Sequence, residues 1–231
     1  MTIDVITTPD AEAAARAAAE FVAHRATETI EQTGRFVWAV SGGSTPARFL
    51  GALAEHDDID WSAIHLFQVD ERIAPAQAPE RNDTMIRERL VSRRPEVDYH
   101  PMPVEADDLA AALIAHRATM AQLTGSPVVL DLVQLGLGDD GHTASLVDGD
   151  PALRCSDDLT VTGLYRGTRR VTMTAPLLNR ADQRLFLVTG TDKDRALDRL
   201  AGGDPQIPAT LITVTSTTLV TDRPVAAFSP D

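Results

Sequence analysis

Short apolar runs alternate with longer segments of helical periodicity along most of the chain. In the longer segments apolar residues recur every three or four positions, as in an amphipathic helix. Strands that alternate with helices are typical of an α/β protein, in which right-handed crossovers place helices on both faces of a parallel sheet. We therefore predict a doubly wound, mostly parallel sheet of the Rossmann-like kind. The predicted strands are 2–7, 36–40, 64–69, 128–135, 170–174, 184–188 and a tail strand around 218–226, and the predicted helices are 10–32, 46–55, 82–94, 107–123, 176–181 and 192–200.

The segments between these elements suggest where the chain is irregular. Residues 73–81 are rich in Pro, Ala and Gln and are predicted to form a surface loop, and residues 148–168 show little regularity. The tail alternates apolar and polar residues in the manner of an edge strand. No internal repeat or low-complexity linker divides the chain, so we expect residues 1–231 to form a single domain.

The turn after the strand at 36–40 has the composition of a phosphate-binding loop. It consists of Ser41, Gly42, Gly43, Ser44 and Thr45 and leads into a predicted helix. Glycines and hydroxyl residues between a strand and a helix can form a nest of backbone N–H groups that binds a phosphate. An ordinary serine-capped turn has the same local sequence. The Gly-Lys-Ser/Thr ending of a nucleotide P-loop is absent.

Charged residues follow other predicted strands. Asp70, Glu71 and Arg72 come directly after an apolar run, where Asp70 could fix the geometry of Arg72 against an anionic or carbonyl oxygen. A solvated loop is the alternative for this charge cluster. Lys193 lies in the first turn of a predicted helix, where a cation is unfavourable unless an anion binds there. An exposed lysine is the alternative, and Arg170 at the start of its strand is a weaker candidate.

The segment Gly136–Leu146 carries the strongest candidate for a general base. It follows an apolar strand and places His142 among glycines, with Asp140 two residues before it. The carboxyl ends of parallel strands meet at one edge of the sheet, and a nearby carboxylate can orient an imidazole and raise its basicity. The Gly-x-Ser-x-Gly elbow that would make Ser145 a hydrolase nucleophile is absent.

The other histidines have no comparable setting. We interpret them as structural or surface residues, and no Cys/His cluster or His-x-x-x-His spacing is present to complete a metal site. We therefore predict no metal. The residues are His24, His56, His65, His100 and His116.

Composition narrows the range of partners. The 21 basic and 34 acidic residues give a formal charge of −13, which disfavours nucleic acid and anionic membranes because both are polyanions. A small anionic substrate remains compatible with this charge if its pocket is locally positive. The single cysteine, Cys155, excludes an intrachain disulfide framework, and neither a secretory leader nor a membrane span is indicated. We expect a cytoplasmic protein.

The glycines of the histidine segment also match the dinucleotide-binding pattern. Gly136, Gly138 and Gly141 satisfy Gly-x-Gly-x-x-Gly. In that pattern the intervening residues approach a pyrophosphate, which Asp139 and Asp140 would repel, and the usual position is the first βα turn. A nicotinamide-dependent oxidoreductase is therefore disfavoured, and we predict no cofactor.

Six motifs occur in the order known from one protein family. They are Ser41–Pro46, Asp70–Arg72, Asn82, Gly136–Leu146, Arg170–Thr174, and Phe186–Gly190 followed by Lys193. In these motifs the chain resembles the glucosamine-6-phosphate isomerase/6-phosphogluconolactonase family, in its lactonase branch. The resemblance implies hydrolysis of 6-phospho-D-glucono-1,5-lactone to 6-phosphogluconate, the second step of the oxidative pentose phosphate pathway, without metal or nucleotide.

The resemblance also implies roles for individual residues. His142 would be the general base that takes a proton from water, and Arg72 would stabilise anionic charge at the reacting end. Asp70 and Asp140 would orient these groups. The substrate phosphate and sugar would be bound by Ser41, Gly42, Gly43, Ser44, Thr45, Lys193, Arg170, Asn82 and Gly138.

The isomerase branch is the nearest rival. Its members resemble one another in an Asn-Glu-Pro shortly after the histidine, where this chain has Leu146 and Val147, and this departure favours the lactonase. The chain differs from the lactonase pattern as well, in Val147–Gly149 where Phe-Pro-Gly is usual and in Asp222 without a tryptophan. A glucosamine-6-phosphate isomerase/deaminase and a non-catalytic sugar-phosphate-binding module remain alternatives. The sequence leaves the oligomeric state open and is compatible with a monomer.

Overall fold

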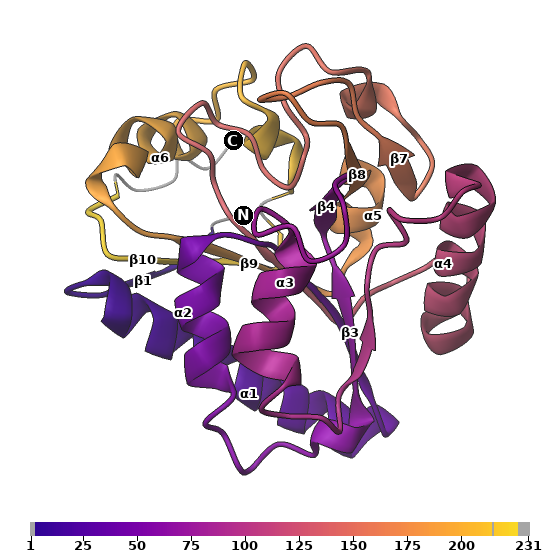
Figure 1. Ribbon diagram of the computed structural model, residues 1–231. Helices are drawn as coiled ribbons and strands as arrows, with labels where there is room; N and C mark the ends of the chain where they lie inside the picture. The colour runs from indigo at the N-terminus through magenta and orange to yellow at the C-terminus, as the bar shows by residue number, and fades with distance from the viewer. Residues whose placement is uncertain (1–2, 214, 226–231) are drawn as a thin grey trace.

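The central sheet of the protein is parallel throughout. The computed structural model describes residues 3–213 and 215–225 (Figure 1). Every neighbouring pair of the seven strands runs in the same direction, which confirms the predicted doubly wound sheet. From one edge to the other the strands are β1 (Asp4–Thr7), β10 (Thr217–Thr221), β9 (Gln183–Val188), β6 (Leu132–Leu135), β2 (Phe36–Val40), β3 (Ile64–Gln68) and β5 (Asp98–His100).

Helices cover both faces of this sheet. Successive side chains of a strand point to opposite faces, so Phe36 and Trp38 of β2 belong to one hydrophobic cluster and Val37 and Ala39 to the other. The first cluster is covered by α1 (Ala11–Thr33), α2 (Ser44–Leu53) and α3 (Asn82–Ile86), which continues as a π-helix over Arg87–Val91. The second is covered by α4 (Leu109–Thr124), α5 (Ala175–Arg180) and α6 (Asp194–Ala201).

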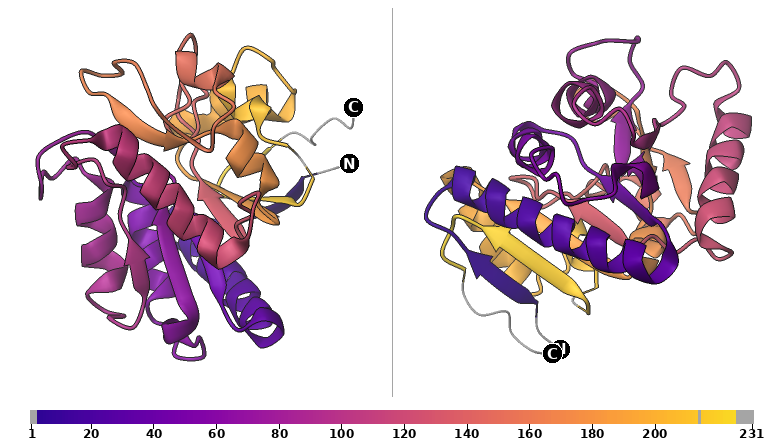
Figure 2. Two further views of the ribbon diagram at one scale, coloured as in Figure 1. Left: turned by 90° about the vertical axis from the view of Figure 1, so that its right-hand side faces the viewer. Right: turned by 90° about the horizontal axis from the view of Figure 1, so that it is seen from below.

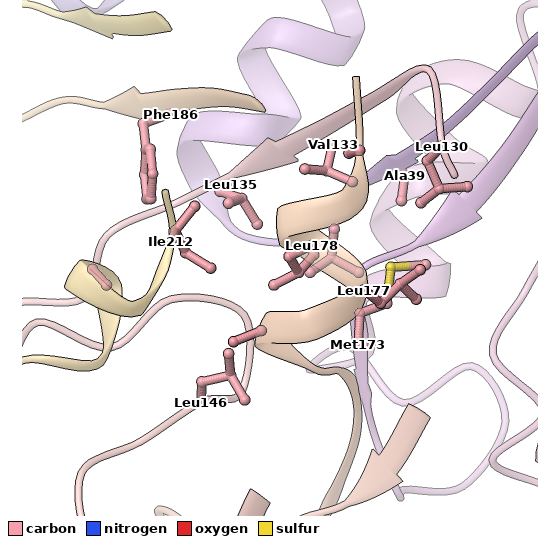
Figure 3. Packing of buried hydrophobic residues seen from close by; sticks show 14 of the residues in the cluster. Ala39, Leu130, Val133, Leu135, Leu146, Met173, Leu177, Leu178, Phe186 and Ile212 are labelled. Carbon is pink, nitrogen blue, oxygen red and sulfur yellow. The ribbon is translucent and has the colours of Figure 1, made fainter. Parts of the chain in front are cut away.

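The packing of these layers fixes the loop that carries His142. Figure 3 shows Leu177 and Leu178 of α5 against Val133 and Leu135 of β6, with Leu146 among the same buried side chains. On the opposite face, α1 lies alongside β10 (Figure 2). Because Leu146 is fully buried, it anchors the end of the histidine loop in the core.

A second, smaller sheet was not predicted. It consists of β4 (Asp70–Arg72), β8 (Arg170–Met173) and β7 (Leu159–Val161), with β8 in the middle and both pairs antiparallel. Its register places Arg72 opposite Arg170. The interpretation of Asp70–Arg72 as a solvated loop is therefore wrong, because the segment is a strand and two of its side chains are buried.

The tail strand lies inside the sheet rather than at its edge. β10 pairs with β1 on one side and β9 on the other, so the prediction of an edge strand is wrong. Threonines supply polar positions of the alternating pattern, yet Thr217, Thr218 and Thr221 are all buried. β-Branched threonine packs well on a pleated surface, so alternation with threonine does not mark exposure. Residue 226, the end of the predicted strand, lies outside the described residues.

Neighbouring strands come from opposite ends of the chain. β1 pairs with β10, so segments from near both ends of the chain lie side by side in one sheet. The short 3-10 helices are Trp61–Ala63, Pro151–Arg154, Thr191–Lys193 and Pro208–Leu211. Within residues 3–213 and 215–225, no helix combines the length and apolar character needed to cross a bilayer.

Candidate active site

Four loops meet in one cleft at the carboxyl edge of the sheet. They follow β9, β6, β2 and β3, which are consecutive neighbours in the sheet. The chain winds outward in opposite directions from β2 and β6, and such switch points are where open α/β sheets bind ligands. The cleft has a volume of about 190 Å³ and is lined by Ser41, Gly42, Asp70, Arg72, Asn82, Gly136, Leu137, Gly138, Asp139, His142, Thr143, Ala144, Arg166, Arg170 and Lys193.

Most of the predicted site residues line this cleft, and four do not. Gly43, Ser44 and Thr45 form the start of α2 beside it, and Asp140 contacts His142 from outside the lining. Two larger hollows lie elsewhere on the surface, one between α1, α2 and the π-helix and one beside α4, and neither is lined by a predicted site residue. The chemistry predicted from sequence is therefore concentrated in one place.

His142 is held by one carboxylate oxygen and one aromatic ring. Its Nδ1 lies 2.6 Å from Oδ1 of Asp140, and its backbone N–H donates to the same oxygen at 3.1 Å. Tyr165 donates its hydroxyl to the other carboxylate oxygen of Asp140 at 2.8 Å, and its ring meets the imidazole edge to face at 5.4 Å. The contact to Asp140 assigns the proton of a neutral imidazole to Nδ1, which leaves Nε2 as the basic nitrogen.

Glycine is required where the histidine loop folds back on itself. A Cβ on Gly138 would lie 2.0 Å from Nδ1 of His142 and 2.6 Å from Oδ1 of Asp140. Gly141 has a φ of +88°, and a Cβ there would lie 2.4 Å from Ile207. These glycines thus serve the contact between imidazole and carboxylate, rather than the approach of a pyrophosphate.

The carboxylate of Asp140 stays ionised over the whole physiological range. Burial favours its neutral form, but hydrogen bonds from the side chain and backbone of His142 and from Tyr165 outweigh burial and lower the pKa to about 2. A pKa below the usual 3.8 stabilises the folded protein above that pH, and the stabilisation is lost as the pH falls towards 2. His142 therefore faces a negative charge at any pH at which catalysis could occur.

Replacing Tyr165 with phenylalanine is expected to raise the pKa of Asp140 and to lower kcat moderately, by about 2–10-fold, because one neutral hydrogen bond contributes about 0.5–1.5 kcal/mol. NMR titration of the carboxyl carbons would measure the first effect, and an assay of lactone hydrolysis, the reaction that the sequence resemblance implies, the second. The chain has one other tyrosine, so Tyr99→Phe is the matched control. An unchanged Asp140 titration in Tyr165→Phe would contradict the role given to this hydroxyl.

Asp70 holds together several of the segments that form the cleft. One of its carboxylate oxygens accepts from the hydroxyl of Ser145 and lies 3.9 Å from the guanidinium of Arg170, which also contacts that hydroxyl at 3.4 Å. Asn82 donates to the backbone oxygen of Asp70 at 2.8 Å and to its carboxylate at 3.2 Å. Ser145 is thus a buried structural link, in agreement with its exclusion as a nucleophile.

Arg72 is positioned by Asn82 rather than directly by Asp70. Its guanidinium donates to the side-chain oxygen of Asn82 and to the backbone oxygen of Glu80 at 2.8 Å. The side chain of Asn82 fits here only because residue 42 is a glycine, since a Cβ on Gly42 would lie 1.8 Å from the amide oxygen. The predicted orientation of Arg72 by Asp70 is therefore corrected to an indirect one, through the amide of Asn82.

Glu71 has no role predicted from the sequence, yet it is fully buried. Its carboxylate accepts hydrogen bonds from the backbone N–H groups that begin α3, and so caps a helix 11 residues further along the chain. It also lies 3.5 Å from the buried guanidinium of Arg81. The four donors are Nε2 of Gln68 and the backbone N–H groups of Arg72, Asn82 and Asp83, at 2.7–2.9 Å.

Some hydroxyl and N–H groups of the predicted phosphate loop already have hydrogen-bond partners, and others do not. Ser41 donates its hydroxyl to the backbone oxygen of Gln134 at 3.0 Å and its N–H to the side-chain oxygen at 3.3 Å, so both are already occupied. The hydroxyl of Thr45 contacts that of Thr189 at 2.9 Å. No side chain caps the start of α2, a ten-residue helix, and its first N–H groups are therefore left for an anion or water.

Lys193 enters the cleft from the loop after β9. It ends a 3-10 turn and caps α6, and its amine lies 3.2 Å from Asp192. The turn begins at Gly190, whose φ is +100° and whose N–H donates to Asp222 at 2.9 Å. Asp222 thus holds this loop, although the tryptophan that accompanies this aspartate in the lactonase pattern is absent here. Lys193 is the only lysine in the chain, whose other 20 basic residues are arginines, and this signal was available from the sequence alone.

A hairpin between β7 and β8 supplies two residues that were not predicted, Arg166 in the cleft lining and Tyr165 beside Asp140. Arg166 and Gly167 have φ values of +49° and +80°, and Tyr165 and Thr168 exchange backbone hydrogen bonds across them. This is the geometry of a tight two-residue hairpin turn. It brings Tyr165 to Asp140 and Arg166 to 3.3 Å from Asp139. The pair Arg166-Gly167, within the segment 148–168 that shows little regularity, is the sequence feature that could have indicated this turn.

Arg169, the neighbour of Arg170 in the chain, does not line the cleft. Its guanidinium donates to the backbone oxygen of Thr162 at 3.1 Å, whereas Arg170 is buried and lines the site. Burial lowers the pKa of Arg170, and Asp70 partly offsets this. The guanidinium of Arg170 also lies over the ring of Tyr165 at 5.1 Å. The structure therefore places Arg170 at the site.

Comparison with known proteins identifies the family. Residues 9–221 match the sequence profile described as glucosamine-6-phosphate isomerases/6-phosphogluconolactonase. The chain belongs to this family. A 6-phosphogluconolactonase from Synechocystis sp. is 40% identical over 193 residues, which are 80% of each chain. The GDH/6PGL endoplasmic bifunctional protein of Homo sapiens is 36% identical over 179 residues, which are 73% of this chain and 22% of the human one.

Solved structures show that both branches of the glucosamine-6-phosphate isomerase/6-phosphogluconolactonase family share this fold. A 6-phosphogluconolactonase from Trypanosoma cruzi superimposes with a TM-score of 0.82 at 25% identity, over 96% of this chain and 95% of the other. A monomeric glucosamine-6-phosphate deaminase gives a TM-score of 0.80 at 19% identity. Fold alone therefore does not separate the branches, and the distinction depends on sequence and on the site.

Proposed function

We propose that this chain is a 6-phosphogluconolactonase that hydrolyses 6-phospho-D-glucono-1,5-lactone in the oxidative pentose phosphate pathway. The observation that carries the proposal is the cleft itself. In a protein with a formal charge of −13, four cationic side chains, from Arg72, Arg166, Arg170 and Lys193, line the cleft beside a His–Asp pair and outnumber its two lining carboxylates, Asp70 and Asp139. Such a locally positive cleft attracts an anionic substrate. Relatives that are 30–40% identical and carry the name 6-phosphogluconolactonase support the same enzyme class.

His142 acts as the general base in this proposal. Its Nε2 takes a proton from water as the water oxygen attacks the lactone carbonyl, and Asp140 stabilises the resulting imidazolium. The carbonyl oxygen becomes an oxyanion, which Arg72 stabilises. When the intermediate collapses, the bond between the carbonyl carbon and the ring oxygen breaks, and the imidazolium returns its proton to that oxygen. No metal or nucleotide takes part in these steps.

The phosphate end of the substrate lies at the other side of the cleft. Lys193 provides a positive charge there, and the uncapped start of α2 provides N–H groups. Arg170 contributes further positive charge. Because the hydroxyl of Ser41 is turned towards Gln134, we assign the contribution of this loop to its backbone rather than to that hydroxyl.

Replacing Lys193 with alanine is expected to raise KM for the phosphorylated lactone by about 10–100-fold with a smaller effect on kcat, because a hydrogen bond to a charged group contributes about 1.5–3 kcal/mol. The same variant should hydrolyse unphosphorylated gluconolactone as the parent protein does. Lys193→Arg is the control that keeps the charge. A KM unchanged by Lys193→Ala would place the phosphate elsewhere.

The proposed function is tested by following loss of 6-phosphogluconolactone above its spontaneous hydrolysis, with purified protein. A rate no faster than the background would contradict it. Saturable binding of 6-phosphogluconate without turnover would support the sugar-phosphate-binding module instead. Turnover of glucosamine 6-phosphate would support the isomerase branch. A cytoplasmic location remains a prediction from the cysteine content of the sequence.

A further inference from the structure

Three potential metal ligands converge at the edge of the sheet, away from the cleft. Nδ1 of His65 lies 3.1 Å from Oδ2 of Asp98, Nε2 of His100 lies 3.3 Å from the same oxygen, and the two nitrogens are 3.5 Å apart. His65 is on β3, and the other two residues are at the ends of the three-residue edge strand β5. His65 precedes Asp70 by five residues, or roughly 15 Å of extended chain.

The register between the two strands produces this arrangement. β3 and β5 are parallel, with His65 opposite Asp98 and Phe67 opposite His100. Residues two apart on a strand share a face, so all three ligands lie on the same side of the sheet. The ring of His100 stacks on Phe67 with centroids 4.4 Å apart and an angle of 15° between the planes, which fixes the direction of its Nε2.

The distances among the three donor atoms match those of a tetrahedral ion. Donors bound at about 2.0–2.1 Å in a tetrahedral arrangement are about 3.3–3.4 Å apart, close to the observed 3.1, 3.3 and 3.5 Å.

Burial and exposure suit a bound ion with an open position. The side chains of His65 and His100 are about one-fifth exposed, and that of Asp98 is 56% exposed, so a water can reach a fourth coordination site. A neutral imidazole is the form that binds a metal.

We propose that His65, Asp98 and His100 bind one divalent transition-metal ion, with Zn²⁺ the cation that best fits two imidazoles and a carboxylate. The ion joins the edge strand β5 to β3. The site is separate from the catalytic cleft and plays no part in lactone hydrolysis. From the sequence both histidines are interpreted as structural or surface residues, because His65 is 33 residues from Asp98 and 35 from His100 and only strand pairing brings them together.

The proposal is tested by titrating Zn²⁺ into the full-length protein in competition with a chromophoric chelator. One ion per chain is expected. The variants His65→Ala, His100→Ala and Asp98→Asn should each weaken binding on the order of 100-fold or more, because even residues that only support a ligand cost about 10–100-fold. Co²⁺ should give the visible absorption bands of a low-coordinate site, and Mg²⁺ should not compete because it prefers oxygen ligands.

Two variants control for other binding positions. His56→Ala removes a histidine that contacts a single carboxylate, Asp58, at 3.3 Å, and should leave Zn²⁺ affinity unchanged. His142→Ala removes the histidine of the cleft and should also retain binding. Zn²⁺ should raise the Tm of the parent protein and not that of Asp98→Asn, an exposed and conservative change that is expected to fold. Absence of Zn²⁺ binding, binding that survives Asp98→Asn and His65→Ala, or binding lost only in His142→Ala would overturn the proposal.

Discussion

Replacing His142 with alanine is expected to lower kcat for lactone hydrolysis by about 10²–10⁴-fold, the usual contribution of a positioned general base. The residue lines the cleft, and its Nδ1 is occupied by Asp140, so Nε2 is the nitrogen available to water. KM should change much less, because the phosphate contacts lie on other loops. Stopped assays at several substrate concentrations would separate the two parameters.

A matched control exists in His24, whose side chain is 72% exposed on α1 and contacts only Glu28 among the salt-bridge partners described. His24→Ala should be as active as the parent protein. Because the folded protein retains the Tyr165–Asp140 contact without the imidazole, His142→Ala should also keep its fold, which circular dichroism would check. A kcat for His142→Ala within about twofold of the parent value would rule out the general-base role.

Replacing Glu71 with alanine is expected to lower the free energy of unfolding by about 3–5 kcal/mol, the cost of breaking a buried ion pair by removing one partner. The change leaves the N–H groups at the start of α3 without their acceptor in a site from which water is excluded, and the buried guanidinium of Arg81 keeps only its second carboxylate partner, Glu105. Urea unfolding followed by fluorescence would measure the loss.

The control for Glu71 is an exposed acid on the helical segment that Glu71 caps. Glu88 is 67% exposed and pairs only loosely with Arg89 at 3.5 Å, so Glu88→Ala should cost less than about 1 kcal/mol. Equal unfolding midpoints for Glu71→Ala and Glu88→Ala would show that the buried carboxylate does not hold α3. Since Asn82 and Arg72 both depend on Glu71, the variant should lose catalytic efficiency at temperatures where it remains folded.

The convergence of the cleft could be predicted from the sequence because it follows from a general property of parallel sheets. Each motif was recognised directly after an apolar run, and carboxyl ends of parallel strands lie at one edge. The pairing of His142 with Asp140 was accessible for the same local reason, since two residues of a tight glycine turn are bound to be close. Their catalytic roles remain predictions.

What could not be predicted depends on contacts between distant segments. The link from Asp70 to Ser145 and Arg170 spans 75 and 100 residues and exists because β4 and β8 pair in an antiparallel sheet that no periodicity indicated. The strand at 170–174 was predicted, but β4 has only three residues, all charged, and is too short to produce a pattern that would reveal its partner. The hydrogen bond from the hydroxyl of Ser41 could not be predicted for a similar reason, because its acceptor, Gln134, lies on the neighbouring strand β6.

The solitary lysine of the cleft gives the protein a chemical handle. Because every other basic side chain is an arginine, an amine-selective reagent finds one side-chain target, Lys193, at the place where we expect the substrate phosphate. Reductive methylation with an isotopically labelled aldehyde would introduce a single NMR reporter there, without mutation. The resonance of that one group would follow the arrival and departure of sugar phosphates in solution, free of overlap from any second labelled lysine.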